Sequence, residues 1–218
     1  MGGFGTRLKE ISGDIPKPMV QIGGQPFVYH LMKKLESAGC SKIILSLHYN
    51  AQYIIQKISS DKPVSCEIQF VVEDTPLDTG GALKLAAQNV TTEFFIAING
   101  DTISDFDYLS LFESPKSADI VIAAVEVENA SRYGSLLFDS EMNLLRIKEK
   151  GIDGPGFINS GTYLIKTKML LNVKEEVFSL EEFYLPVYKP VTKIIVFEGY
   201  FIDIGIPEDY LLACKKFA

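Results

Sequence analysis

The alternation of β-rich and helix-periodic segments between residues 27 and 98 constrains the fold more than any other feature of this 218-residue sequence. In the helical segments, apolar side chains recur at the spacing of one helix face, whereas the runs between them are short and rich in β-branched residues. This rhythm favours an α/β fold with a mainly parallel sheet, because helices then connect successive strands. The predicted segments are helices at 27–40, 51–58 and 80–88 and strands at 42–48, 67–73 and 93–98.

The rhythm changes from about residue 119. Strand-like segments there are joined by short turns, as expected of an antiparallel region, and the chain closes with a strand, a turn and a helix. We therefore predict a three-layer α/β/α sandwich with a mainly parallel, Rossmann-like mixed sheet and a small β-rich lobe, in one compact domain. The segments concerned are strands at 119–127, 135–139, 144–150, 161–166 and 193–199 and a helix at 208–217.

Composition excludes several classes of protein. Hydrophobic residues make up 47% of the chain, which is enough for a sizeable core, and the formal net charge of −7 argues against nucleic acid or an acidic membrane as a partner. Cys40, Cys66 and Cys214 form no disulfide or zinc-ligand pattern and are expected to be reduced thiols. No apolar run is long enough for a transmembrane helix. We expect a soluble, cytoplasmic protein.

The first eight residues contain a glycine-rich segment, GGFGTRL at 2–8. Without Cβ atoms, Gly2, Gly3 and Gly5 allow the backbone to approach an anion and turn its N–H groups toward it. The segment matches neither the P-loop nor the dinucleotide fingerprint. Thr6 and Arg7 follow the glycines, and the planar guanidinium suits phosphate oxygens. The alternative interpretation is a mobile N-terminal tail.

A lysine stands between two prolines in the segment DIPKPM at 14–19. Pro16 and Pro18 restrict the backbone on both sides, so Lys17 is predicted to be presented on a stiff, extended stretch. Such a cation suits a bound phosphate group, and a rigid surface turn is the alternative.

A glycine pair, Gly80 and Gly81, enters the helix predicted at 80–88. The pair allows close approach of the backbone to a polar ligand at a helix N-terminus. A tight connection between strand and helix accounts for it equally well on local grounds.

The strand at 93–98 runs directly into Asn-Gly-Asp, which places Asp101 at the carboxyl end of a predicted buried strand. Ligands bind at this edge of open α/β sheets, and a carboxylate after a glycine is a natural ligand for Mg²⁺. Asp203 follows a second, aromatic strand and would complete a pair able to hold one cation. Helix capping is the alternative role for Asp101.

Three further polar residues lie on neighbouring predicted strands. Glu149 and Asn159 suit sugar hydroxyl groups, and Lys150 suits a phosphate monoester. Taken singly, Glu149 and Lys150 also fit an exposed charged hairpin. His30 and His48 lie within ordinary helix and strand patterns and are predicted to be structural.

Taken in order, seven of these segments resemble the sugar-1-phosphate nucleotidyltransferases, over essentially the whole chain. One such motif is weak evidence, whereas seven in the same order are specific. The segments are GGFGTRL at 2–8, PKPM at 16–19, EDTPLDTGGA at 73–82, NGD at 99–101, EK at 149–150, NSG at 159–161 and DIGIP at 203–207.

This resemblance implies the nucleotide-diphospho-sugar transferase fold, with residues 1–118 binding nucleotide and residues 119–218 binding the sugar phosphate and closing the domain. It also implies a role for each candidate residue. The roles are catalysis for Arg7, Lys17 and Asp101, nucleotide binding for Gly2, Gly3, Gly5, Thr6, Thr79, Gly80 and Gly81, sugar-phosphate binding for Gly100, Glu149, Lys150 and Asn159, and Mg²⁺ binding for Asp101 and Asp203.

Within this family, the short chain and the segments DIPKPM, SRYGSLLFD and FIDIGIPEDY look most like the enzymes that guanylylate a heptose 1-phosphate for bacterial surface polysaccharides. The resemblance implies GTP and a sugar 1-phosphate as substrates, with a homo-oligomer left open. Transfer of a uridylyl or thymidylyl group to a hexose or amino-sugar 1-phosphate remains an alternative. So does a non-catalytic regulatory protein that binds nucleotide sugars.

The chain departs from the family pattern at two places. Asp78 stands where relatives usually have glycine, and its charge either opposes nucleotide binding or points to solvent. Family members also begin with an apolar strand of roughly eight residues before the glycine loop, and none is present here. We expect a start placed too far downstream or a truncated chain, with residues 1–8 mobile without ligand and activity weak.

Overall fold

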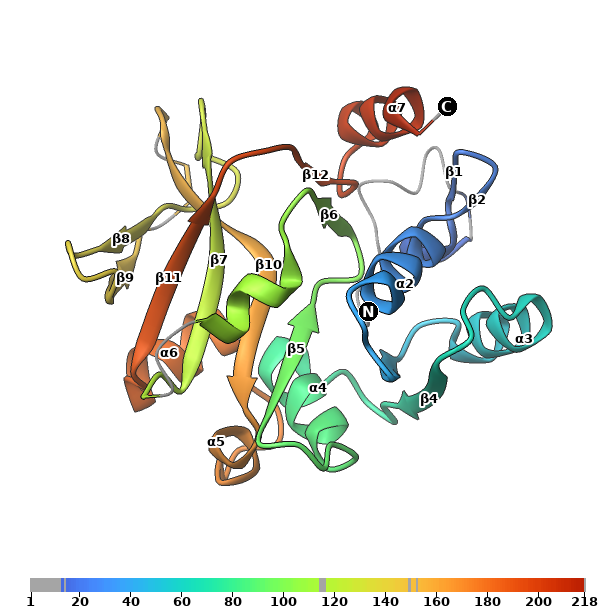
Figure 1. Ribbon diagram of the computed structural model, residues 1–218, viewed down its shortest axis with the longest axis horizontal. Helices are drawn as coiled ribbons and strands as arrows, with labels where there is room; N and C mark the ends of the chain where they lie inside the picture. Colours follow the sequence, from blue (N-terminus) through green and yellow to red (C-terminus); the bar gives the residue numbers. More distant parts are fainter. Residues whose placement is uncertain (1–12, 14, 114–116, 149, 152, 218) are drawn as a thin grey trace. The chain divides into compact units, whose positions relative to one another are not determined.

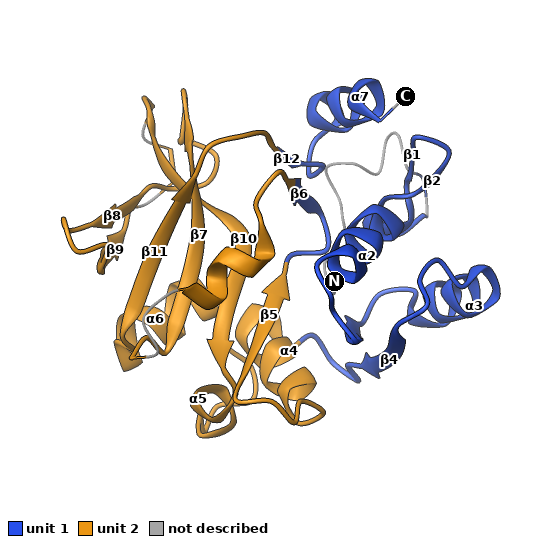
Figure 2. Cartoon of the chain, viewed as in Figure 1, with its two compact units in different colours: residues 1–76, 99–103, 202–218 blue, residues 77–98, 104–201 orange. Residues whose placement is uncertain are grey.

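The computed structural model describes residues 13, 15–113, 117–148, 150–151 and 153–217 (Figure 1). Figure 2 shows that the chain forms two compact units, each built from stretches that are distant in the sequence. Unit 1 comprises residues 1–76, 99–103 and 202–218, and unit 2 comprises residues 77–98 and 104–201. Among the predicted site residues, Gly2, Gly3, Gly5, Thr6, Arg7 and Glu149 lie outside the described residues.

Unit 1 contains a parallel pair of strands, β3 and β4, and three α-helices in its described part. Every second residue of β3 is buried, and these side chains pack with the apolar faces of α2 and α3. The 3₁₀ turn η2 packs on α2, and the hairpin of β1 and β2 leads into that helix. The elements are η2 (Lys17–Met19), β1 (Gln21–Ile22), β2 (Gln25–Pro26), α2 (Phe27–Ser37), β3 (Lys42–Leu47), α3 (Ala51–Asp61), β4 (Glu67–Val72) and α7 (Pro207–Lys216).

Unit 2 is built on a four-stranded mixed sheet in the order β11-β7-β10-β5. Strand β11 is parallel to β7, whereas β10 is antiparallel to both β7 and β5. The first six residues of β7 are buried, because apolar side chains cover both faces of this central strand. The elements are α4 (Asp78–Ala87), β5 (Phe94–Ile98), η3 (Tyr108–Glu113), β7 (Ile120–Val127), β8 (Leu136–Phe138), β9 (Leu144–Ile147), β10 (Gly156–Lys166), α5 (Thr167–Leu171), the π-helical turn η4 (Leu180–Tyr184), α6 (Leu185–Tyr188) and β11 (Thr192–Phe197).

Two short strands, β6 (Thr102–Ser104) and β12 (Phe201–Asp203), pair with each other where the chain passes from one unit to the other. The predicted α/β class is confirmed, and so are the parallel pairing of β3 with β4 in the first half and the antiparallel pairing after residue 119. Strand β5 departs from the parallel pattern predicted for the first half, because it pairs antiparallel with β10. Strand β11 adds a parallel pairing to the second region. The assignment of substrates to residues 1–118 and 119–218 stays a prediction.

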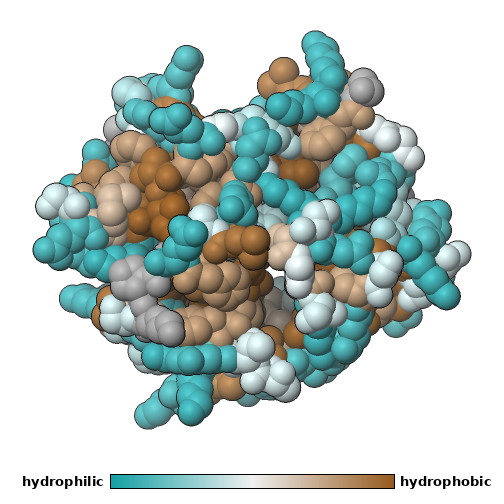
Figure 3. All heavy atoms as spheres, viewed as in Figure 1, coloured by the Kyte–Doolittle hydropathy of each residue, from teal (hydrophilic) through white to brown (hydrophobic). Residues whose placement is uncertain are grey.

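The surface carries several large apolar side chains. On the face in Figure 3, hydrophilic and hydrophobic residues are interspersed. Leu211 and Leu212 on α7 are each more than half exposed. A homo-oligomer stays a prediction. In the described ranges, no helix combines the length and the apolar character needed to cross a bilayer.

The two histidines take part in structural contacts, as predicted. A ring nitrogen of His30 lies 2.8 Å from the Ile22 carbonyl oxygen, and its ring packs on that of Phe217. The Nδ1 atom of His48 lies 3.0 Å from the carbonyl oxygen of Glu73.

Candidate active site

Lys17 is presented by a tight turn. Pro16 precedes η2, and the N–H group of Met19 donates to the Pro16 carbonyl oxygen at 2.7 Å. The buried side chains of Pro18 and Met19 anchor the turn beneath the lysine. The prediction of an extended stretch is therefore wrong. The fixed φ of proline also fits the first turn of a helix, and the hydrogen bond of the Met19 N–H group closes that turn. The prolines and this hydrogen bond restrict the backbone around Lys17, in agreement with the expected stiffness.

The lysine reaches a carboxylate that lies 84 residues further along the chain. Its Nζ atom lies 3.2 Å from Oδ2 of Asp101, and both groups belong to unit 1. The side chains are 20% and 35% exposed, so the pair remains accessible from solvent. Gly100 lies in the turn just before Asp101, between β5 and β6. In the described part of the chain, the structure brings together two of the residues predicted to be catalytic.

The residue after Asp203 is hydrogen-bonded to the backbone of Asp101. The N–H group of Ile204, the residue after Asp203, donates to the Asp101 carbonyl oxygen at 2.9 Å. Ile204 is fully buried and anchors this segment. The N–H group of Gly205 donates to Oδ1 of Asp203 at 2.8 Å, which orients that carboxylate. The two predicted metal ligands are thus held by main-chain bonds at the ends of neighbouring segments.

The donor set fits a divalent metal ion. Mg²⁺ is commonly held by one or two carboxylates together with water and substrate phosphates. Asp101 and Asp203 provide two such carboxylates, and among the described residues there is no group of three or more acidic, histidine or cysteine side chains that would form a complete protein cage. The ammonium group of Lys17 neutralises part of the acidic charge. The site therefore suits a cation that is partly coordinated by its substrate.

In unit 2, the predicted nucleotide segment at the start of α4 is bound to the segment before η4. The N–H groups of Gly80 and Gly81 both donate to the carbonyl oxygen of Phe178, at 2.9 and 3.1 Å. An added Cβ atom would lie 2.2 Å from the Phe178 ring at Gly80 and 2.2 Å from the Glu176 carbonyl oxygen at Gly81. Close packing against residues 176–178 thus accounts for the pair, a long-range contact that neither interpretation of the sequence included. Nucleotide binding by these residues stays a prediction.

Thr79 makes side-chain contacts with the same region. Its hydroxyl group donates to Oε2 of Glu181 at 2.9 Å and accepts from the N–H group of Leu180 at 2.9 Å. The preceding residue, Asp78, has a positive φ of 59°, which glycine adopts more readily, and its exposed carboxylate accepts from the Thr79 N–H group. Exposure of Asp78 agrees with the second of the two alternatives for its charge, that it points to solvent.

Asn159 is half-buried on β10 and both ends of its amide are bound. Its Nδ2 atom donates to the Tyr163 hydroxyl oxygen at 2.7 Å, and its Oδ1 atom accepts from the N–H group of Gly161 at 2.9 Å. The Tyr163 hydroxyl group in turn donates to Oε1 of Glu181 at 2.5 Å. Lys150 is exposed in the turn between β9 and β10 and has no hydrogen bond or ion pair to a described residue.

Neither Tyr163 nor Glu181 belongs to the site residues predicted from the sequence. Tyr163 resembles an ordinary core aromatic residue, and Glu181 resembles a solvated charge at the start of a helix. One signal was nevertheless present in the sequence. Tyr163 follows Asn159 by four residues with a glycine between them, and glycine inside a strand often marks a bulge.

Comparison with known proteins places the chain in a family. The sequence model of the nucleotidyl transferase family matches residues 1–218. The chain is 37% identical to D-glycero-alpha-D-manno-heptose 1-phosphate guanylyltransferase of Campylobacter jejuni, over 96% of this chain and 94% of the relative. The enzyme of the same description from Aneurinibacillus thermoaerophilus is 34% identical, over 99% and 95%.

A solved structure is similar over the full length. The crystal structure of HddC from Yersinia pseudotuberculosis matches with a TM-score of 0.93 and 49% identity, covering 100% of this chain and 96% of that one. A second structure of HddC, complexed with GMP-PN, matches with a TM-score of 0.92 and the same identity and coverage. Members of the matching family generally use a divalent metal, in agreement with the paired carboxylates. The chain therefore belongs to the nucleotidyl transferase family and is one of its enzymes.

Proposed function

We propose that this enzyme transfers the guanylyl group of GTP to D-glycero-α-D-manno-heptose 1-phosphate and releases pyrophosphate. The observation that carries the proposal is the full-length similarity to two heptose 1-phosphate guanylyltransferases and to HddC, which was solved with a guanine nucleotide analogue. The paired Lys17 and Asp101 support it, because two phosphate anions can be neutralised by a fixed cation and by a metal ion that a carboxylate holds. We also propose the cytoplasm as the compartment.

The reaction brings two anions together. A phosphate oxygen of the sugar 1-phosphate attacks the α-phosphorus of GTP, a new P–O bond forms, and the bond between the α-phosphorus and the bridging oxygen breaks. The electron pair of that bond leaves with pyrophosphate. No covalent bond to the protein is required, so the enzyme acts by aligning the reactants and neutralising their charge.

Charged residues of unit 1 provide this neutralisation. Lys17, held in its turn beside Asp101, places a cation against the triphosphate, and Arg7 adds a second. Asp101 and Asp203 would hold Mg²⁺. When bound, the ion withdraws charge from the phosphate oxygens and favours departure of pyrophosphate.

The remaining candidate residues bind the two substrates. The glycine loop around Gly2 and Gly5 wraps the nucleotide, and Thr79 with its two glycines lies against the base and ribose. Gly100, Glu149, Lys150 and Asn159 bind the sugar phosphate. Two observations on described residues support the assignment to the sugar phosphate. The Asn159 amide has a fixed orientation, and Lys150 is exposed.

A substrate screen tests the proposal. Four nucleoside triphosphates are each combined with heptose 1-phosphate and with hexose 1-phosphates, and released pyrophosphate is measured. We expect the highest kcat/KM with GTP and the heptose. Faster turnover of UTP or dTTP would overturn the nucleotide assignment. Nucleotide binding by calorimetry without pyrophosphate release from any pair would favour a regulatory protein.

A pair of lysine variants tests the site. Lys17→Met removes the proposed cation and is expected to lower kcat/KM by about 10²–10³, as for loss of a preorganised electrostatic contact. Lys42→Met is the matched control, because Lys42 also forms a partly exposed ion pair in unit 1, with Glu67 at 3.2 Å. Equal activities of the two variants would remove Lys17 from the mechanism.

A further inference from the structure

A continuous hydrogen-bond chain joins Asn159 to the start of α4 within unit 2. It runs from the Asn159 amide to the Tyr163 hydroxyl group, then to the Glu181 carboxylate, and from its other oxygen to the Thr79 hydroxyl group. The heavy-atom distances along this chain lie between 2.5 and 2.9 Å. Its two ends are residues that we assign to opposite substrates, Asn159 to the sugar phosphate and Thr79 to the nucleotide.

A bulge in β10 brings the first two members together. Asn159 lies opposite Ala124 of β7 and Tyr163 lies opposite Ile122, so the three residues 160–162 face a single residue, Ala123. Residues four apart in a regular strand are separated by about 13 Å along it, whereas positions opposite Ala124 and Ile122 are separated by about 7 Å. The bulge therefore shortens the distance enough for the amide to reach the phenol.

The conformation of this bulge is specific. Gly161 has a φ of 73°, and the Ser160 hydroxyl group donates to the Ala123 carbonyl oxygen at 2.8 Å. Bulges of this kind are often found beside functional sites, where they redirect a side chain. Here the redirected side chain is Asn159, whose Oδ1 atom accepts from the N–H group of Gly161 inside the bulge.

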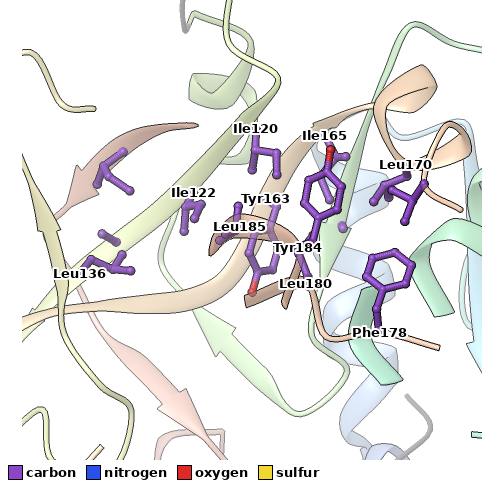
Figure 4. Close-up of a cluster of buried hydrophobic side chains, with 14 residues drawn as sticks. Ile120, Ile122, Leu136, Tyr163, Ile165, Leu170, Phe178, Leu180, Tyr184 and Leu185 are labelled. Atoms are coloured by element: carbon purple, nitrogen blue, oxygen red, sulfur yellow. The ribbon is translucent and has the colours of Figure 1, made fainter. Parts of the chain in front are cut away.

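Burial fixes the direction of the hydrogen bonds. Tyr163 is 2% exposed, and Figure 4 shows its ring among Ile122, Leu180, Tyr184 and Leu185. Burial first, and then the negative charge of Glu181, raise the pKa of Tyr163 well above its usual value. The phenol thus stays protonated, donates to Glu181 and accepts from Asn159. One N–H bond and one lone pair of the Asn159 amide are left for a ligand.

We propose that Tyr163 is a positioning residue, which, anchored by Glu181, holds the Asn159 amide in the orientation that binds the sugar 1-phosphate. The inference rests on the proposed function, because it assigns Asn159 to that substrate. Tyr163 is buried and acts through Asn159. Its contribution is therefore expected in the KM for the sugar phosphate.

The first test compares two tyrosine-to-phenylalanine variants. Tyr163→Phe removes the hydroxyl group that orients Asn159 and is expected to raise the KM for heptose 1-phosphate about two- to tenfold, with the KM for GTP changed less than about twofold. Tyr184→Phe is the matched control. It lies in the same buried cluster, and its hydroxyl group makes no hydrogen bond to a described residue. A purely structural role for Tyr163 would lower the unfolding midpoint and leave both KM values unchanged, and that result would overturn the proposal.

A double-mutant cycle with Asn159→Ala gives the decisive measurement. If Tyr163 acts through Asn159, adding Tyr163→Phe to Asn159→Ala should change the KM for heptose 1-phosphate by less than about 1.5-fold. The proposal would be overturned if Tyr163→Phe raised this KM by the same factor in Asn159→Ala as in the wild type. An unchanged KM in the Asn159→Ala single variant would also overturn it. If Tyr163→Phe does not fold, Glu181→Ala replaces that substitution in the cycle. Glu181→Ala removes the carboxylate that accepts from the Tyr163 hydroxyl group, and Glu181 is only half-buried.

Failure of the proposed function has a different signature. In that case the wild-type enzyme does not turn over GTP with heptose 1-phosphate, whatever the variants do. The cycle is then measured with the substrate pair that the screen identifies, and non-additivity in the KM for the sugar phosphate supports the role of Tyr163 for that pair.

Discussion

Alanine substitutions at the start of α4 test whether its glycine pair is required by packing. At Gly80 the new Cβ atom would lie 2.2 and 2.4 Å from two ring atoms of Phe178 and 2.9 Å from its carbonyl oxygen. At Gly81 it would lie 2.2 Å from the Glu176 carbonyl oxygen and 2.9 Å from Cβ of Leu77. An ordinary contact begins at 3.4 Å, so the segment facing the helix has to move by about 1 Å.

The cost of this movement follows from the hydrogen bonds that it disturbs. Among the described residues, four main-chain N–H groups donate hydrogen bonds between this segment and the helix start: those of Gly80 and Gly81 to Phe178, that of Phe178 to Leu77, and that of Leu180 to Thr79. Each contributes about 0.5–1.5 kcal/mol, and alanine returns about 1 kcal/mol of helix propensity. We therefore expect each variant to lower the free energy of unfolding by about 1–3 kcal/mol, in the range of other overpacked sites.

Equilibrium denaturation in urea measures the effect, and a second substitution separates the two positions. Phe178→Leu removes a ring atom that the Gly80→Ala side chain would strike. The loss in free energy of unfolding of the double variant should therefore be about 1 kcal/mol smaller than the sum of the losses in the two single variants. The effects of Phe178→Leu and Gly81→Ala on the free energy of unfolding should be additive, because the atom nearest to the new side chain at Gly81 is the main-chain carbonyl oxygen of Glu176. Unchanged unfolding midpoints would refute this packing argument, whatever the effect on GTP binding.

Three further predictions concern aspartates. Asp78→Gly should be about 1 kcal/mol more stable than Asp78→Ala in urea denaturation, because φ is positive there, and equal stabilities would contradict this. Hydrogen bonds from the side chain and the backbone N–H group of Asn143 lower the pKa of Asp139. Its stabilising contribution is thus present above the pKa of the unfolded chain and is lost as pH falls through the lower folded value, so Asp139→Ala should reduce the thermal midpoint at pH 7 and have little effect near pH 2. Asp203→Asn should raise the Mg²⁺ concentration for half-maximal activity by about tenfold or more, and an unchanged Mg²⁺ dependence would remove Asp203 from the metal site.

Local patterns predicted most of the secondary structure. The apolar spacing from Phe27 to Ala38 predicted α2, and Phe27 and Leu31 are buried in it. Lys17 shows the limit of such reasoning, since the residue before a proline was expected to be extended and instead starts a 3₁₀ turn. The decisive contact there is the hydrogen bond of the Met19 N–H group, which the proline rule does not include.

The candidate site was predictable by residue type and not by arrangement. Asp101 was selected from the strand-to-turn boundary that precedes it, yet its partner Lys17 is 84 residues away and no local pattern joins the two. The contact between Asn159 and Tyr163 depends on the register shift in β10. An alternating apolar pattern gives no information on such a shift, because the bulge restores the same sheet face on both sides of it.

The division of unit 1 into three stretches has a consequence for the order of synthesis. Lys17, Asp101 and Asp203 each come from a different stretch, and the last also supplies β12, the strand that pairs with β6. On the ribosome, the proposed metal pair exists only after Asp203 has been made, when all of unit 2 has already been synthesised. A nascent or prematurely terminated chain that contains Lys17 and Asp101 therefore lacks the second carboxylate of the proposed metal pair, and we expect it to be inactive.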